Sequence, residues 1–427
     1  MTHTVTEHTL STGTKGLLID VPNSEVVNFN FTFNAGYQFT DFAKYDIPHL
    51  IEHHILNATE RYPGNGEVQR EIALNGAYSN AFTGPEFIGY VAECAAFEVE
   101  RIIDLHIELL TRPLFPEEFY MTERENVRTE LKNYLSNYSR QTSRLNGAAN
   151  FPKEVLRYED RITRLDSITH KDVVDHYHRT HTARNANFVI SGATQANTEL
   201  ILGKLELLYG ALPQGERSSL IDEAGTGTKA PLVISNTIDS IHFELEWYVK
   251  EGGIGRRAAG GVLASIIGGG WASRLFGRAR RDGLTYSLGA SSSISPSAQS
   301  FEISGFCTAD KWERLMSLTN DVLSDLVANG PTQEEVEAAQ KRIIGSLTRR
   351  YQTAGNMAGW YAGNFMAYGT TKSPEEYMKE ISSVTVDMVM AEAKRIFNSD
   401  RHSLALVGPV TDAETAAFAK HMAPVWQ

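Results

Sequence analysis

A strict alternation of apolar and polar residues marks the first predicted strand. Val27, Phe29, Phe31 and Phe33 are apolar, and the three positions between them are polar. Because successive side chains of a strand point to opposite faces, this pattern predicts a β-strand with one buried face. Further strands are predicted at residues 78–83 and 87–94, and helices at residues 48–59, 67–74, 97–111 and 116–137.

The same order of elements recurs in the second half of the chain. Residues 241–249 alternate as a strand, a helix is predicted at 256–267, and two strands follow near Leu284 and Phe301. Two pairs of segments share a pattern at an offset of 216 to 217 residues: 115–135 with 331–351, and 167–177 with 383–393. This repeat predicts an α+β fold of two similar domains, each a mainly antiparallel sheet with helices packed on one face.

The boundary between the two domains is expected at residues 213–230. This segment is rich in Gly, Ser and Thr and has no hydrophobic period, as is typical of a linker. The predicted domains are therefore residues 1–212 and residues 231–427.

Composition excludes several classes of protein. The 427 residues include 40 Lys and Arg against 52 Asp and Glu, so the formal charge is −12, which argues against nucleic-acid binding. The two cysteines, Cys94 and Cys307, are too few for a disulfide framework or a cysteine zinc site. The N-terminus lacks the pattern of an export signal, and the longest weakly polar run, 258–272, is too short to cross a membrane. We therefore expect a cytoplasmic protein with no membrane or nucleic-acid partner.

The sharpest chemical motif is His49-Leu50-Ile51-Glu52-His53. On a helix, residues i, i+3 and i+4 lie on one face, so His49, Glu52 and His53 are expected to project together. Two imidazoles one turn apart suit one zinc ion, and the glutamate between them suits a general base acting on water. The motif lacks a third protein ligand. The alternative for the motif by itself is a solvated helix face.

Two glutamates on the long helix from residue 116 make the motif more specific. Glu123 and Glu130 lie two turns apart, and Glu130 follows His53 by 77 residues. This arrangement resembles the pitrilysin/insulinase family of inverzincin zinc metallopeptidases, which includes mitochondrial processing peptidase. The resemblance implies one Zn²⁺ per chain, bound by His49, His53 and Glu130. It also implies that Glu52 is the catalytic base and that Glu123 supports the site.

A second segment of the first half resembles the same family. Residues 76–83, Gly-Ala-Tyr-Ser-Asn-Ala-Phe-Thr, are similar to the family's Gly-x-x-x-Asn-Ala-x-Thr strand. The resemblance implies a sheet edge to which substrate adds as an extra strand, with Asn80, Ala81 and Thr83 at the substrate-binding positions. The alternative is an ordinary hairpin strand.

The second half resembles the family in its substrate element. Residues 268–276 and 283–287 are similar to the family's Gly-Gly-x-x-Ser-Arg-Leu-Phe and Gly-Leu-x-Tyr-Ser signature. The resemblance implies that Tyr286 and an arginine, Arg280, bind substrate and stabilise the tetrahedral intermediate. The spacing is one residue shorter than usual, so Arg278 and Arg281 stay open as alternatives, and Arg281 is a candidate substrate-binding residue.

Two other features of the sequence carry no catalytic role in this interpretation. The second half has no His-x-x-Glu-His, and the repeat places Leu347 opposite Glu130, so the zinc chemistry is assigned to the first half. The histidines of the segment 176–181 have no carboxylate at ligand spacing, and we expect them on the surface.

The resemblance implies an overall organisation and an activity. Each chain is expected to form half of a clamshell chamber, as a homodimer or a heterodimer with a related subunit. The expected activity is that of a zinc-dependent endopeptidase cleaving short or unfolded peptides. The alternatives are a non-catalytic peptide-binding or assembly subunit of a heterodimeric processing peptidase, and a metal-dependent hydrolase of non-peptide substrates.

Overall fold

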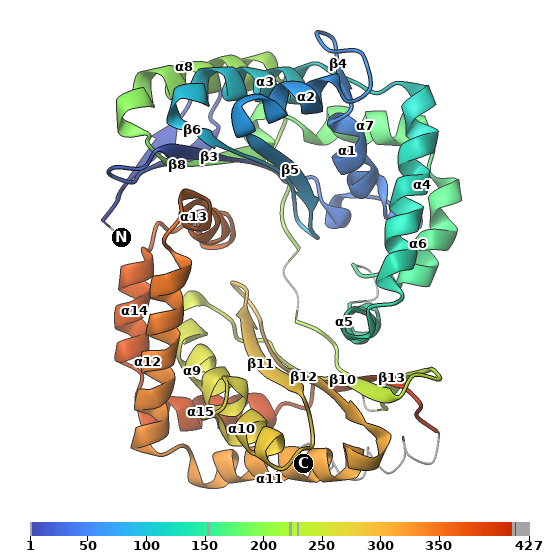
Figure 1. The fold of residues 1–427 in the computed structure, drawn as a ribbon, viewed down its shortest axis with the longest axis vertical. Coiled ribbons are helices and arrows are strands. Elements are labelled where there is room, and N and C mark those ends of the chain that lie inside the picture. The colour runs from blue at the N-terminus through green and yellow to red at the C-terminus, as the bar shows by residue number, and fades with distance from the viewer. Residues whose placement is uncertain (1, 152–153, 222–223, 229, 412–414, 416–427) are drawn as a thin grey trace. The chain divides into compact units, whose positions relative to one another are not determined.

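The computed structural model describes residues 2–151, 154–221, 224–228, 230–411 and 415 (Figure 1). Contacts within the chain divide it into two units. Unit 1 comprises Met1–Lys132, Glu159–Ile221 and Arg350–Lys372. Unit 2 comprises Asn133–Tyr158, Asp222–Arg349 and Ser373–Gln427. Each unit therefore includes one segment from the opposite half of the sequence.

Unit 1 contains a six-stranded sheet in the order β1-β2-β8-β3-β6-β5. Its strands are β1 (Thr4–Thr9), β2 (Lys15–Asp20), β3 (Val26–Phe33), β5 (Tyr78–Thr83), β6 (Ile88–Ala95) and β8 (Ala186–Gly192). All neighbours are antiparallel except β2 and β8, which run parallel. The strands predicted at 78–83 and 87–94 match β5 and β6 closely.

Strand β3 is buried on both faces, not on one as its alternation predicted. Phe31 packs against His106 of α3 (Val99–Thr111) on the apolar face. On the polar face, the Thr32 hydroxyl lies 3.3 Å from the sulfur of Met366 in α13 (Ala354–Tyr368). Asn30 and Thr32 are consequently buried. A helix from the second half of the sequence covers the face that the alternation alone marks as exposed.

The first four helices of unit 1 lie close to the predicted positions, and three more follow that were not predicted. They are α1 (Ile47–Ile55), α2 (Glu67–Ala73), α3, α4 (Glu117–Tyr134), α6 (Tyr158–Arg164), α7 (His170–Thr180) and α8 (Thr198–Ala211). Helices α3 and α8 lie on the side of the sheet away from α13 (Figure 1). The predicted helix 48–59 is shorter, because β4 (Ala58–Thr59) pairs with β7 (Pro113–Leu114).

Unit 2 repeats this architecture. Its sheet has the order β11-β12-β10-β13-β9, with β9 (Leu232–Ser235), β10 (Ser240–Val249), β11 (Ser287–Ile294), β12 (Gln299–Thr308) and β13 (His402–Gly408). This is the order β5-β6-β3-β8-β2 of unit 1, and β13 and β9 form the parallel pair. The predicted α+β fold with a duplicated sheet is confirmed.

Two helices are exchanged between the halves of the sequence. In unit 2, the first-half helix α5 (Tyr138–Asn150) packs against β10 and β13. In unit 1, the second-half helix α13 packs against β3 and β8. The other helices of unit 2 are α9 (Arg257–Gly268), α10 (Arg274–Arg281), α11 (Trp312–Asn329), α12 (Gln333–Arg350), α14 (Pro374–Ser382) and α15 (Val386–Phe397). The boundary predicted at 213–230 does not anticipate this exchange.

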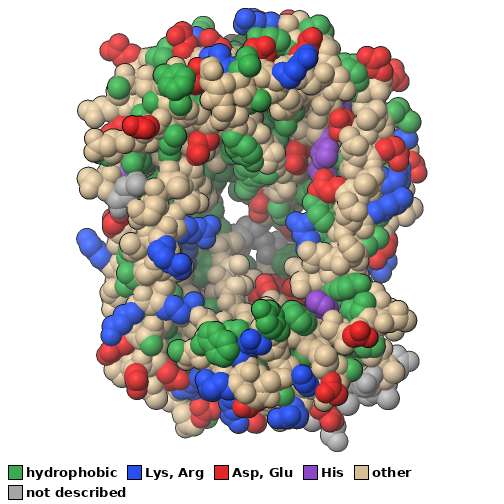
Figure 2. Space-filling model, viewed as in Figure 1, with side chains coloured by type: hydrophobic (Ala, Val, Ile, Leu, Met, Phe, Trp, Pro, Cys, Tyr) green, Lys and Arg blue, Asp and Glu red, His purple; other side chains and the backbone are tan. Residues whose placement is uncertain are grey.

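Acidic and basic side chains are interspersed on the face of the molecule drawn in Figure 2. Among the described residues, no helix has both the length and the apolar character needed to span a bilayer.

The face of β10 that contacts α5 carries a buried acidic side chain. Asn146 of α5 donates its amide Nδ2–H to Glu244 Oε1 at 3.0 Å. Burial, together with the charges of Glu302 and Glu246, raises the pKa of Glu244 to about 8. Burial also raises the pKa of Glu246 to about 7. The docking surface of α5 is therefore built around Glu244, a carboxyl group whose pKa lies above neutral pH.

This arrangement makes stability depend on pH. Between pH 4.5 and about 8, folded Glu244 keeps a proton that the unfolded chain has released, so the free energy of unfolding falls as pH rises through this window. The variant Glu244→Gln keeps a neutral group at every pH. The difference in free energy of unfolding between the variant and the parent protein should therefore shift in favour of the variant by roughly 2–4 kcal/mol from pH 5 to pH 9. Urea denaturation at both pH values measures this difference. Glu337→Gln, on the exposed face of α12, is the control, and an equal pH dependence of the parent and Glu244→Gln would contradict the assignment.

Candidate metal centre

Helix α1 carries the central residues of the candidate site. It begins just after Asp46, with Pro48 in its first turn, where the missing N–H has no intrahelical partner to lose. The helical period brings His49, Glu52 and His53 to one side, and ligand-type atoms of the three residues lie within 4.8 Å of one another. The Asp46 side chain does not cap the helix by a hydrogen bond, although it occupies the N-cap position.

Helix α4 supplies a carboxylate that meets both histidines. Glu130 Oε2 lies 3.4 Å from His49 Nε2 and 3.3 Å from His53 Nε2. With metal–ligand bonds of about 2.0–2.2 Å, the ligand atoms of a tetrahedral zinc ion lie about 3.3–3.6 Å apart. His49, His53 and Glu130 therefore fit a zinc ion in both chemistry and spacing. The side chains of His53 and Glu130 are partly exposed, so the centre is accessible from solvent.

Glu52 stands beside these groups without a competing partner. Its side chain is half-buried, and among the described residues it forms no hydrogen bond or ion pair. A carboxylate in this state is available to accept a proton from a molecule bound at the centre.

Glu123 of α4 holds the other nitrogen of His53. Glu123 Oε2 lies 3.3 Å from His53 Nδ1, and the glutamate accepts amide hydrogens from Asn57 at 2.9 Å and Asn126 at 3.1 Å. Burial opposes both charges, but the Glu123 and Glu130 carboxylates raise the pKa of His53 to about 9. Hydrogen bonds from His53, Asn57 and Asn126 likewise lower the pKa of Glu123 despite its burial. Neither asparagine belongs to the sequence motifs described above.

Strand β5 is the last strand of its sheet, beside the candidate metal centre. Its only partner in the sheet order is β6, so its outer edge faces away from the other described strands. The Thr83 hydroxyl contacts the Pro48 carbonyl of α1 at 3.4 Å, Asn80 is exposed, and Ala81 is buried. This strand is positioned to pair with an added extended chain.

The predicted substrate element of the second half lies in unit 2. The guanidinium carbon of Arg280 lies 4.6 Å from the ring centre of Tyr286 and 5.2 Å from that of Trp271. Both rings are largely exposed. Arg281 instead contacts the Trp271 carbonyl, and Arg278 lies 3.9 Å from Asp282. Of the three candidate arginines, Arg280 is the one that stacks on Tyr286.

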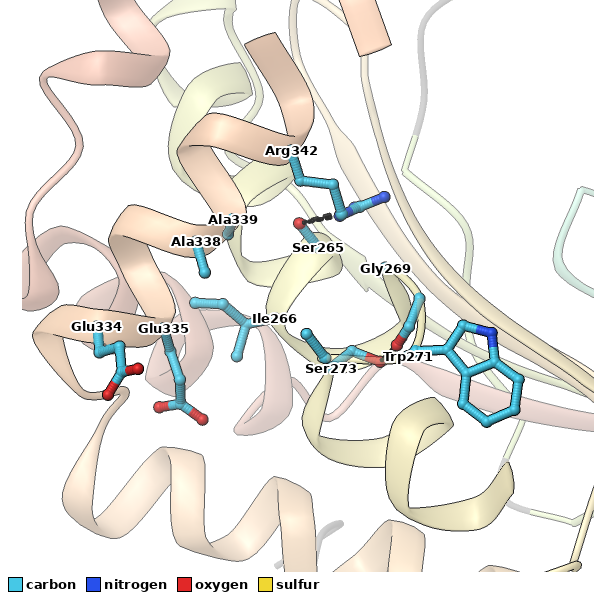
Figure 3. A pocket seen from close by; sticks show the side chains of 12 residues that line it. Ser265, Ile266, Gly269, Trp271, Ser273, Glu334, Glu335, Ala338, Ala339 and Arg342 are labelled. Atoms are coloured by element: carbon cyan, nitrogen blue, oxygen red, sulfur yellow. Dashed lines mark hydrogen bonds between the residues drawn. The ribbon is translucent and has the colours of Figure 1, made fainter. Parts of the chain in front are cut away.

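Helices α9 and α12 of unit 2 take the place of α1 and α4. They border a cavity of about 460 Å³, into which side chains of both helices and of the Gly269–Ser273 loop point (Figure 3). Its lining residues are Ser265, Ile266, Gly269, Gly270, Trp271, Ala272, Ser273, Glu334, Glu335, Ala338, Ala339 and Arg342. None is a histidine. The cavity therefore lacks the donor set of the candidate metal centre.

The repeat also fixes the position opposite Glu130. Helices α4 and α12 begin at Glu117 and Gln333, and this offset places Ser346 there, not Leu347. Neither residue is a carboxylate.

The sequence predicted that the histidines of segment 176–181 lie on the surface, but two of them are buried. His176 and His181 are each 1% exposed. Their nitrogens contact the Ala35 carbonyl at 2.9 Å and the Tyr90 hydroxyl at 2.8 Å, respectively. Burial lowers the pKa of His176 to about 4 and that of His181 to about 3. These rings are neutral parts of the core, and the local sequence carried no signal of it.

Comparison with known proteins agrees with this architecture. The family model described as insulinase (peptidase family M16) matches residues 17–155, and the model described as peptidase M16 inactive domain matches residues 167–343. An uncharacterized zinc protease of Rickettsia felis is 23% identical over 408 residues, which cover 94% of this chain and 96% of that protein. An uncharacterized zinc protease of Bacillus subtilis is 22% identical, over 95% of this chain and 98% of its own.

Solved structures share the fold over nearly the whole chain. A peptidase M16 inactive domain from Pseudomonas fluorescens superimposes with a TM-score of 0.84 at 18% identity, covering 95% of this chain and 98% of that one. A protease from Helicobacter pylori gives a TM-score of 0.81 at 14% identity, covering 95% and 100%. Both family models, the zinc-protease relatives and the shared fold lead to one conclusion: this chain belongs to the insulinase family of peptidases, M16.

Proposed function

We propose that the protein is a zinc-dependent endopeptidase that cleaves short or unfolded peptides. The observation that carries this proposal is the convergence of His49 Nε2 and His53 Nε2 on Glu130 Oε2, at 3.4 and 3.3 Å, with Glu52 beside them. Relatives named as zinc proteases along most of the chain support both the metal and the class of reaction.

In this proposal, His49, His53 and Glu130 hold the metal. A bound zinc ion supplies Lewis acidity, which polarises a carbonyl group and makes a water molecule more acidic. Glu52 removes a proton from the water that attacks the peptide carbon. It then gives that proton to the leaving amine nitrogen as the C–N bond breaks. Glu123 holds the His53 ring in place through Nδ1.

The choice of substrate follows from strand β5. Its free edge offers backbone N–H and C=O groups, which an extended chain satisfies by adding as a further strand. Such pairing reads the backbone and requires the substrate to be locally unfolded. We assign Asn80, Ala81 and Thr83 of β5 to contacts with the added substrate strand. We assign Arg280 and Tyr286 of unit 2 to further substrate contacts.

The first test is incubation of an unstructured peptide mixture with the purified chain and zinc, followed by mass spectrometry. We expect fragments from the parent protein and none from Glu52→Gln, because the amide cannot accept the proton of water, whereas zinc content stays equal in both. Cleavage by the purified chain shows that it needs no subunit of a different sequence. No fragments from either protein, with zinc bound to both, support a peptide-binding or assembly subunit instead.

A second prediction concerns the partner of His53. Glu123→Ala should weaken zinc binding by about 10–100-fold, because His53 loses the acceptor that orients its ring. Competition with a chromophoric chelator measures the affinity. Glu125→Gln, on the same helix but paired with Arg128, is the matched control and should bind zinc like the parent. An unchanged affinity in Glu123→Ala removes this residue from the site.

A third prediction concerns Tyr286. Tyr286→Phe should slow peptide cleavage by at least several-fold through loss of one O–H donor, with no change in melting temperature because this side chain is 74% exposed. Steady-state cleavage of a fluorogenic peptide tests it. A rate equal to that of the parent protein excludes the tyrosine hydroxyl from the reaction.

A further inference from the structure

We propose that Asp46 is a positioning residue for the metal ligand His49, and that the buried Arg161 holds Asp46 in that role. This inference rests on the proposed zinc site and assigns functions to two residues outside the His-x-x-Glu-His motif. A histidine binds a metal through one ring nitrogen only when its remaining proton lies on the other nitrogen. The group that faces His49 Nδ1 therefore decides whether Nε2 can bind the metal.

The two nitrogens of His49 face two different carboxylates. Nε2 lies 3.4 Å from Glu130, toward the metal position, and Nδ1 lies 3.5 Å from Asp46 Oδ1. An ionised carboxylate only accepts hydrogen bonds, so Asp46 favours the ring form with its proton on Nδ1. That form leaves the Nε2 lone pair directed at the metal position. Asp46 thus stands to His49 as Glu123 stands to His53.

Arg161 of α6 fixes Asp46. Its Nε–H group donates to Asp46 Oδ1 at 3.0 Å, and its Nη2 also donates to Oδ1. Asp46 and Arg161 are only 1% and 4% exposed. The guanidinium also lies against Tyr37 and Tyr45, whose rings stack 4.4 Å apart. Burial opposes ionisation of Asp46, but the charge of Arg161 and the hydrogen bonds from His49 and Arg161 hold its pKa well below the usual range.

One contact in this cluster favours the other form of the His49 ring, with its proton on Nε2. Arg161 Nη2 lies 3.4 Å from His49 Nδ1, and a guanidinium only donates. A bond from Arg161 to Nδ1 would move the ring proton to Nε2 and block metal binding there. Nη2 carries two hydrogens, and it already donates to Asp46 Oδ1 and to the Tyr37 hydroxyl at 3.1 Å. No hydrogen remains for His49, so Asp46 is the partner of Nδ1.

Two features of the structure direct the Asp46 carboxylate toward His49 and Arg161. Asp46 precedes His49 by three residues, which places it on the same side of the helix start. Because its side chain makes no capping hydrogen bond, its carboxylate is free to face Arg161 and His49. Arg161, 115 residues further along the chain, decides that orientation.

The experiment measures zinc affinity by chelator competition, independently of any cleavage. Asp46→Ala should weaken zinc binding by about 10–100-fold, and it also leaves Arg161 buried without a counter-charge. The double variant Asp46→Ala/Arg161→Met removes both charges and should recover much of the melting temperature of the metal-free protein. Affinity that stays 10–100-fold low in the double variant supports positioning. Recovery of affinity along with stability overturns it, because Asp46 is then only structural.

Two further variants complete the test. Asp46→Asn keeps the size and an acceptor for Arg161, so it should fold and bind zinc with an affinity between those of the parent and Asp46→Ala; parental affinity overturns the inference. Asp172→Asn, in an ion pair with Lys44 in the same unit, is the control and should leave affinity unchanged. A parent protein that binds no zinc overturns the proposed function itself, which separates that failure from failure of the positioning role.

Discussion

The constraint on which the site depends is that every ring nitrogen of two histidines one helical turn apart needs a partner. His49 and His53 direct Nε2 to the same Glu130 oxygen, and each directs Nδ1 to a different carboxylate. Three acidic side chains therefore gather around two imidazoles in a partly buried place. Such a cluster is costly unless a cation shares it, and without a metal the carboxylates raise the pKa of both rings. The surrounding helices are arranged to meet this requirement.

Local patterns were sufficient to predict much of the fold and the centre of the site. The period of α1 puts His49, Glu52 and His53 on one side, and the period of α4 does the same for Glu123 and Glu130. The alternation of residues 27–33 gave the central strand, and the repeat gave the second sheet. These features depend on spacing within one element, which the sequence records directly.

Features that depend on distant segments could not be predicted in this way. The direction of the Asp46 side chain is decided by Arg161, and the burial of Thr32 by Met366, 334 residues away. Similarly, His176 and His181 sit in a polar-looking run but face the core of unit 1. In each case a tertiary contact overrides the local preference of a polar residue for solvent. The contact of Asn57 with Glu123, 66 residues away, belongs to the same class.

The exchange of α5 and α13 bears on what each half of the chain is by itself. Residues 1–212 lack the helix that covers the polar face of β3, and residues 231–427 lack the helix that satisfies Glu244. A fragment cut at the linker would expose to solvent a sheet face that the exchanged helix buries in the whole chain. The two copies of the fold therefore complete each other, because each takes one helix from the other half of the sequence.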